Sequence, residues 1–225
     1  MKSLIEYINE GTDLEYTISG TEGNFDYVDL ELPSGTMWAT CNVGADKPED
    51  YGLLFQWGRT DGYKYGDKNH QLKTKEQNEQ ETGMWCIPQT VSEKNYNKRN
   101  NTLDLEDDAA HANMGGKWRM PTKDEFYELM HNTYQRPKTI NGVKGLLFIS
   151  TINRRSTLFI PLSGYWDEFT DKFETLGRYT CVWTSTLHPR YYNLAYTVDC
   201  NINANVSMNR SNRSSGYIVR GVFKK

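Results

Sequence analysis

The clearest structural signal in this chain is the stretch GGKWRMPTKDE, residues 115–125. The Thr122 hydroxyl can accept a hydrogen bond from the backbone of a helix that begins after it, and Glu125, three residues on, can reach back to the backbone of Thr122. Apolar side chains then follow at the spacing of one helical face, at Phe126, Leu129 and Met130. The stretch therefore predicts a helix from Thr122 to about Asn132.

On both sides of this helix the sequence has the pattern of strands. Upstream, residues 27–32 alternate apolar and acidic side chains, and a second strand is expected over residues 36–41. Downstream, turn residues separate short runs that favour strands: Leu146 to Ile149, Thr157 to Pro161, Val182 to Ser185, Leu194 to Cys200 and Gly216 to Phe223. A shorter helix is expected from Glu106 to Asn113, ended by Gly115-Gly116. The predicted fold class is α+β, with mostly antiparallel strands and one or two helices.

The chain is expected to form one domain over residues 25–225, preceded by an N-terminal segment or connector over residues 1–24. A short helix fits Ser3 to Asn9. Residues 59–101 are rich in polar side chains and predict a long surface loop around the apolar island Met84-Trp85-Cys86-Ile87. Loops of this length are functional or locally disordered, and the sequence leaves both interpretations open.

Composition argues against several classes of function. The net charge of −3 and the pI of about 5.9 leave no basic footprint for nucleic acid. No apolar run is long enough to span a bilayer, and residues 1–7 turn polar too soon for a signal peptide. We therefore expect no nucleic-acid partner and no membrane insertion. The cysteines are too widely spaced for a metal or redox pair, which favours reduced, buried thiols: Cys41, Cys86, Cys181 and Cys200.

The C-terminal stretch has an unusual composition. Residues 184–217 contain no Lys, Glu, Gln or Trp. Asn and Ser occupy alternate positions from Asn201 to Asn209, which on one strand would place them all on one face. Asn is poor in strands, so a one-sided Asn row predicts a role other than folding. The alternative is a polar β-meander with an open face, because strands are also depleted in Lys and Glu.

Several segments together resemble one family. They are residues 27–45, 48–52, 55–58, 107–111, 115–122, 183–186 and 216–220. In this order they resemble the Fibrobacter succinogenes-type major paralogous domain of gut Bacteroidetes proteins, over about residues 25–222. That resemblance implies a C-type-lectin-like fold, shared with formylglycine-generating enzymes. The tryptophans beside the glycines of these segments are expected to be framework residues, as large rings stacked on closely approaching backbone.

The chain also resembles the variable proteins of diversity-generating retroelements in gut Bacteroidetes and their phages. In that group a reverse transcriptase copies a template with errors at adenines, so that Asn codons in the C-terminal strands become a restricted set of other residues. Lys, Glu, Gln, Met and Trp lie outside this set. The resemblance implies a ligand-binding adhesin with a diversified C-terminal face, in a phage tail or fibre, or in the host cytoplasm before assembly.

The expected ligand contacts come from residues 188–193 and 199–215, where Tyr offers large contact area and Asn and Ser offer adaptable hydrogen bonds. They are His188, Arg190, Tyr191, Tyr192, Asn193, Asp199, Asn201, Asn203, Asn205, Ser207, Asn209, Ser211, Asn212, Ser214 and Ser215. The expected partner is a protein or glycan receptor on a target cell surface. The sequence leaves open a homo-oligomer or assembly into a virion.

Two other functions remain as alternatives. One is a non-diversified bacterial surface or secreted binding domain of the same family. The other is an oxidase of the formylglycine-generating type, but its only candidate cysteines, Cys181 and Cys200, lack the spacing of that pattern. The acids at 104–108 lack the spacing of an EF-hand loop, and the four histidines lack that of a metal site or triad. We therefore expect a binding protein without catalysis, metal or cofactor.

Overall fold

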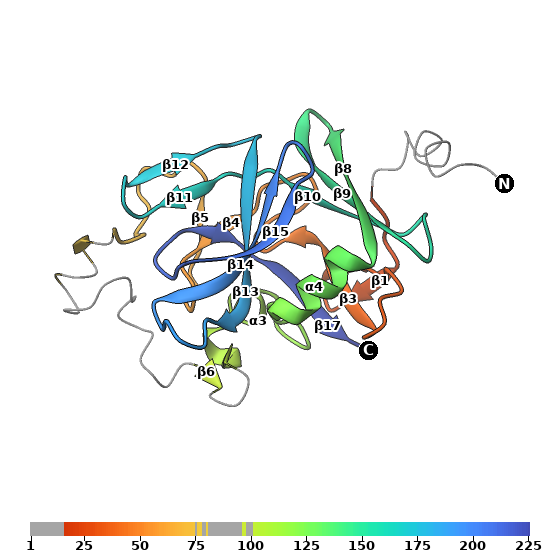
Figure 1. The fold of residues 1–225 in the computed structure, drawn as a ribbon, viewed down its shortest axis with the longest axis horizontal. Helices are drawn as coiled ribbons and strands as arrows, with labels where there is room; N and C mark the ends of the chain where they lie inside the picture. Colours follow the sequence, from red (N-terminus) through yellow and green to blue (C-terminus); the bar gives the residue numbers. More distant parts are fainter. Residues whose placement is uncertain (1–15, 75, 78–79, 81–95, 98–100) are drawn as a thin grey trace.

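The computed structural model describes residues 16–74, 76–77, 80, 96–97 and 101–225 (Figure 1). Strands hold 44% of these residues and helices 11%. The expected α+β class with a C-type-lectin-like fold is therefore wrong, because the protein is sheet-rich, with several separate sheets. The helix expected at Ser3 to Asn9 and the apolar island Met84 to Ile87 lie outside the described residues.

A four-stranded sheet joins the two ends of the described chain, in the order β1-β2-β3-β17. Its strands are β1 (Gly20–Glu22), β2 (Phe25–Val28), β3 (Thr36–Asn42) and β17 (Arg220–Lys224). Strand β3 matches the expectation for residues 36–41. The first predicted strand is shorter than expected and ends at Val28, although Leu30 and Leu32 beyond it are buried.

A three-stranded sheet, in the order β10-β9-β8, contains the strand that the sequence pattern missed. Its strands are β8 (Thr133–Ile140), β9 (Val143–Ser150) and β10 (Thr157–Pro161). Strand β8 contains Pro137 and shows no clean alternation, which an edge strand tolerates. Asn141 and Gly142, both at positive φ, close a tight hairpin that pairs β8 with β9. Such strands at sheet edges explain why the strand content exceeds the expectation.

The largest sheet has eight strands and runs β15-β14-β13-β16-β4-β5, with β7 paired to β13 and β6 paired to β7. Its strands are β4 (Leu53–Phe55), β5 (Tyr63–Lys64), β6 (Tyr96–Asn97), β7 (Thr102–Leu103), β13 (Tyr179–Leu187), β14 (Leu194–Asn201), β15 (Val206–Asn212) and β16 (Tyr217–Ile218). A separate two-stranded ribbon is formed by β11 (Tyr165–Asp167) and β12 (Lys172–Glu174).

The helix predicted from the 115–125 stretch is confirmed as α4 (Lys123–His131). The Glu125 N–H donates to the Thr122 hydroxyl over 3.2 Å, and the Thr122 N–H donates to the Glu125 carboxylate over 2.9 Å. The other predicted helix is split: a turn of 3-10 helix, η2 (Leu105–Asp107), precedes α3 (Ala109–Met114). The split falls at Asp108, whose side chain accepts from the His111 N–H and caps α3.

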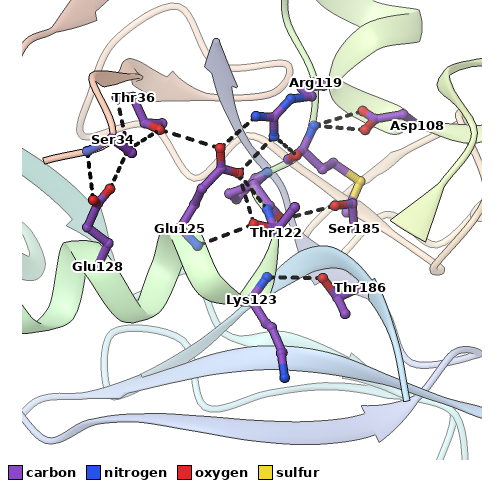
Figure 2. A network of polar contacts seen from close by, with 12 residues as sticks. Ser34, Thr36, Asp108, Arg119, Thr122, Lys123, Glu125, Glu128, Ser185 and Thr186 are labelled. Atoms are coloured by element: carbon purple, nitrogen blue, oxygen red, sulfur yellow. Dashed lines mark hydrogen bonds and ion pairs between the residues drawn. The ribbon is translucent and has the colours of Figure 1, made fainter. Parts of the chain in front are cut away.

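Polar contacts tie the start of α4 to its neighbours, as Figure 2 shows. Glu125 forms a bidentate ion pair with Arg119, at 2.6 and 2.8 Å. The Lys123 N–H donates to the Thr186 hydroxyl, and the Ser185 N–H donates to the Pro121 carbonyl, so α4 begins against β13. Helix α4 contacts β13, β14 and β15 and thereby supports one face of this sheet.

The core is aromatic, as the framework interpretation expected. The indoles of the recurring segments are fully buried, at Trp38, Trp57, Trp118 and Trp183. The Trp57 and Trp183 indole N–H groups donate to the carbonyls of Thr184 and Phe55, which joins β13 to the segment around β4. None of the helices in the described part of the chain is long and apolar enough to cross a membrane.

Candidate functional site

The hairpin of β14 and β15 forms the edge of the large sheet and carries most of the predicted contact residues (Figure 1). Asp199 pairs with Cys181 of β13 on one side and with Ser207 of β15 on the other. Thr197 pairs with Asn209 in the same register. Because directly paired residues share a face, these side chains form one polar face of the sheet.

The opposite face of the same strands is apolar and belongs to the core. It carries Val182, Val198, Cys200, Val206 and Met208. The other face is polar but still packed along β14, where Ala195, Thr197 and Asp199 are buried, and it is exposed along β15 at Ser207 and Asn209. The sheet edge is held in place by these packed residues, so the exposed side chains of β15, Ser207 and Asn209, can differ without loss of packing.

The expected single row of alternating Asn residues is wrong. Residues 202–205 lie between the two strands and form the turn of the hairpin. The Asn201 side-chain oxygen accepts from the N–H groups of Asn203 and Asn205, over 2.9 and 3.2 Å, and Ala204 has a positive φ of 59°. Asn side chains favour such local bonds to the backbone, which explains the Asn-rich sequence without a strand.

The polar face opens into a pocket of about 330 Å³ between the hairpin and the β11–β12 ribbon. It is lined by Tyr165, Asp167, Glu168, Phe169, Tyr179, Cys181, Leu194, Asp199, Asn209, Arg210, Ser211, Asn212, Ser215 and Tyr217. Five of the predicted contact residues are among them: Asp199, Asn209, Ser211, Asn212 and Ser215. We call this space the hairpin pocket.

Two buried carboxylates lie in the hairpin pocket. Glu168 is 2% exposed, and its oxygens accept from the Ser215 hydroxyl over 2.6 Å and from the Asn212 amide over 2.9 Å. Asp199 accepts from the Asn209 amide over 2.8 Å and from the Thr197 hydroxyl over 3.2 Å. Burial raises the pKa of Glu168, and it outweighs the hydrogen bonds that favour the carboxylate.

Three tyrosines surround these carboxylates. The Tyr165 ring packs edge-on against Tyr179 at 6.1 Å and against Tyr217 at 5.8 Å, centroid to centroid. Burial raises the pKa of all three phenols, and nearby acidic groups raise it further. Burial and the Asp199 carboxylate likewise raise the pKa of the Cys181 thiol. All these groups are therefore protonated near neutral pH.

The loop 188–193 lies beside the hairpin pocket and presents two exposed aromatic side chains. Tyr191 and Tyr192 are 55% and 57% exposed. The His188 ring stacks on Tyr191 at a centroid distance of 5.0 Å. Burial lowers the pKa of His188, and so do the charges of Arg210, Arg190 and Lys123. This side of the hairpin is therefore cationic and aromatic.

The structure divides the predicted contact residues into exposed and enclosed ones. Those with exposed side chains are Arg190, Tyr191, Tyr192, Asn203, Asn205, Ser207 and Asn209. Those partly exposed are His188, Asn193, Asn201, Ser211 and Asn212. Asp199, Ser214 and Ser215 are buried, and Asp199 and Ser215 line the hairpin pocket.

Sequence reasoning missed the opposite side of the hairpin pocket. Tyr165 is the first residue of β11, and Glu168 follows the last one. Tyr179 is the first residue of β13, and Tyr217 is the first residue of β16. Tyr179 stands two residues before Cys181, so alternation along β13 was a usable signal for that residue. Nothing in the local sequence marks Glu168, because the ribbon that carries it is placed by contacts distant along the chain.

Among the described residues, neither cysteine proposed for the oxidase alternative has a thiol partner. Cys181 lines the hairpin pocket, whereas Cys200 lies on the apolar face of the neighbouring strand, and both are free. Cys41, the third described cysteine, is also free. Across the described ranges, no group of three or more His, Cys, Asp or Glu side chains is arranged to hold a metal ion. Asp108, one of the acids weighed for calcium, instead accepts from the Met120 backbone.

No family model, no curated protein and no solved structure matches this chain.

Proposed function

We propose that this protein is a ligand-binding protein that recognises a receptor on a target cell surface through the β14–β15 hairpin and the loop 188–193. The observation that carries this proposal is the hairpin pocket, which collects five contact residues expected from the sequence alone. Buried polar groups that converge on a concave space beside exposed aromatic rings are typical of binding sites.

The loop and the pocket form one continuous surface, which supports a shared role. Asn193 of the loop reaches the Asn212 side chain over 3.4 Å, and Asn212 in turn donates to Glu168 inside the pocket. A ligand that contacts Tyr191 and Tyr192 therefore lies next to the pocket opening. Exposed tyrosines supply most of the contact energy in such surfaces, with Asn and Ser as adaptable partners.

We further propose that a retroelement diversifies this surface and that the protein is displayed in a phage tail or fibre. The resemblance of the motifs and the restricted composition of residues 184–217 support this. The test is the DNA beside the gene. We expect a near-copy of the codons for residues 183–220 that differs only at adenines, with a reverse-transcriptase gene nearby. A gene without such a copy contradicts diversification and favours a non-diversified binding domain of the same family.

Binding itself is tested with the fluorescently labelled full chain on a panel of gut Bacteroidetes cells. We expect the double variant Tyr191→Ala/Tyr192→Ala to lose at least about tenfold in affinity, because exposed aromatic anchors dominate such interfaces. Its control is Tyr127→Ala/Tyr134→Ala, which removes two exposed tyrosines on α4 and β8. Equal binding by the two double variants, on cells that bind the unaltered chain, contradicts the proposed site.

A further inference from the structure

The hairpin pocket is acidic and aromatic. Asp167, Glu168 and Asp199 line it, together with four aromatic rings. Its one cationic lining residue is Arg210, which is exposed. The charge of Arg210 lowers the pKa of His188 on the other side of the hairpin. Within the described part of the chain, the interior of the pocket thus has carboxylates and no ion-pair partner for them.

The titratable groups of the pocket are shifted mainly by their burial. The pKa values of Glu168, Tyr165, Tyr179, Tyr217 and Cys181 are all raised. Burial is the largest cause in each. Nearby acidic groups raise the pKa of Tyr165, Tyr179 and Cys181 further, whereas the hydrogen bonds that Glu168 accepts lower its pKa. A buried site at negative potential favours a positive guest, because a cation offsets the cost of burying the carboxylates.

We propose that the hairpin pocket accepts the ammonium group of a lysine side chain on a protein ligand. This inference rests on the proposed function and specifies its ligand. The Glu168 and Asp199 carboxylates come from two different elements, the end of strand β11 and strand β14, and each of their oxygens accepts at least one hydrogen bond. A compact ammonium with three rotatable donors suits such separated acceptors better than a planar guanidinium, which prefers both oxygens of one carboxylate.

The aromatic rings suit the rest of a lysine side chain. Phe169 is 56% exposed and lines the pocket, as does Tyr165 of β11. The methylene groups of lysine pack along such apolar surfaces while the charged end reaches polar partners. An ammonium near an aromatic face gains a further cation–π attraction, which is larger where water is excluded.

The probes are small and differ only in their side chains. Nα-acetyl-lysine methylamide, its norleucine counterpart and its arginine counterpart are titrated into the full chain, and binding is followed by NMR of labelled tyrosines. We expect the lysine probe to shift the NMR signals of Tyr165, Tyr179 and Tyr217. It should also bind about tenfold more tightly than the norleucine probe, because a charge-assisted hydrogen bond contributes that much free energy. Equal affinities for lysine and norleucine overturn the inference, and so does a preference for arginine.

Two variants locate the binding. Glu168→Gln and Asp199→Asn keep the shape of each side chain and are each expected to weaken the lysine probe about tenfold. The control is Glu106→Gln, which removes an equal charge from an exposed position on η2. Near-UV circular dichroism checks that each variant is folded, and one folded pocket variant is enough for the comparison. Unchanged lysine binding in a folded pocket variant overturns the inference.

The outcome for this inference can be separated from that for the proposed function. Loss of cell binding in the Tyr191→Ala/Tyr192→Ala variant supports the binding surface whatever the pocket accepts. If that loss occurs while the tyrosines of the pocket respond only to a neutral sugar such as N-acetylglucosamine, the lysine assignment is overturned and the proposed function stands. Competition of the lysine probe with cell binding supports both.

Discussion

The guanidinium of Arg213 lies over the indole of Trp57, 4.6 Å from the ring centroid, and donates to the carbonyl of Tyr192 over 3.0 Å. The Arg213 N–H also donates to the carbonyl of Asn193, and the Trp57 N–H donates to the carbonyl of Arg213. One buried side chain thus connects the aromatic core to the exposed loop 188–193. Arg213 is a positioning residue for that loop.

We expect Arg213→Met to lower the free energy of unfolding by about 1–3 kcal/mol, because it removes a cation–π contact and a charge-assisted hydrogen bond to a carbonyl. Cell binding should fall as well, although Tyr191 and Tyr192 are unchanged. Urea unfolding and the cell assay measure the two effects. Arg155→Met, at an exposed position of the chain, is the control and should change neither. Full binding by Arg213→Met contradicts the positioning role.

The ion pair between Arg119 and Glu125 is central to the start of α4 (Figure 2). Glu125→Ala should lower the free energy of unfolding by about 3–5 kcal/mol, because it leaves a largely buried Arg119 unpaired and opens the capping box. Asp124 lies in the same turn with its side chain 84% exposed, so Asp124→Ala should cost under about 1 kcal/mol. Chemical denaturation compares them, and a similar cost for both would contradict the role of the network.

The same ion pair predicts an acid-sensitive contribution to stability. Hydrogen bonds from Arg119 and Thr122 outweigh burial and lower the pKa of Glu125. A carboxyl group whose pKa is lower in the folded state stabilises the protein fully at pH values above its unfolded-state pKa. This stabilisation is lost as the pH falls through the folded-state pKa. Unfolding free energies measured from neutral to acidic pH should therefore fall less in Glu125→Gln than in the unaltered chain. Parallel pH profiles would refute this.

For Glu168 we expect the opposite dependence of stability on pH. Burial raises its pKa, so the folded protein binds a proton more readily than the unfolded chain at this position. The contribution of Glu168 to stability is fully present below its unfolded-state pKa and is lost as the pH rises through its folded-state pKa. The unaltered chain should therefore gain stability relative to Glu168→Gln as the pH falls from neutral. A difference that does not vary with pH, in denaturation experiments on both proteins, contradicts the raised pKa.

The buried cysteines should resist thiol reagents in the native state. Cys181 and Cys200 are fully buried and burial raises the pKa of both thiols, so thiolate is scarce and inaccessible. Peptide mapping after a short maleimide treatment should find both unlabelled without denaturant and labelled in urea. Cys41, which is partly exposed, serves as the internal comparison. Rapid native labelling of Cys181 or Cys200 would show that the hairpin opens.

The local structure of this protein was largely predictable from its sequence. The capping box at Thr122 and Glu125, the strand at residues 157–161 and the strand at residues 36–41 were all predicted from residue types within a few positions of each other. Helix caps and strand alternation depend on near neighbours, so sequence patterns report them directly. The predicted contact residues were likewise chosen from composition and local chemistry.

Longer-range features were not predictable in this way. Strand β8 is held by its pairing with β9, and the Asn-rich segment turns instead of extending because β14 and β15 pair in one register. The fold class was wrong for this reason: edge strands acquire their structure from partners, not from their own pattern.

The sequence by itself determined the helix at the 115–125 stretch, the main strands and the polar C-terminal stretch. Only the tertiary structure decided that Glu168 from the ribbon and Asp199 from the hairpin line one pocket. The two residues are far apart in the chain, and no local pattern relates them. Their shared environment comes from burial and convergence, which exist only once the sheets have packed.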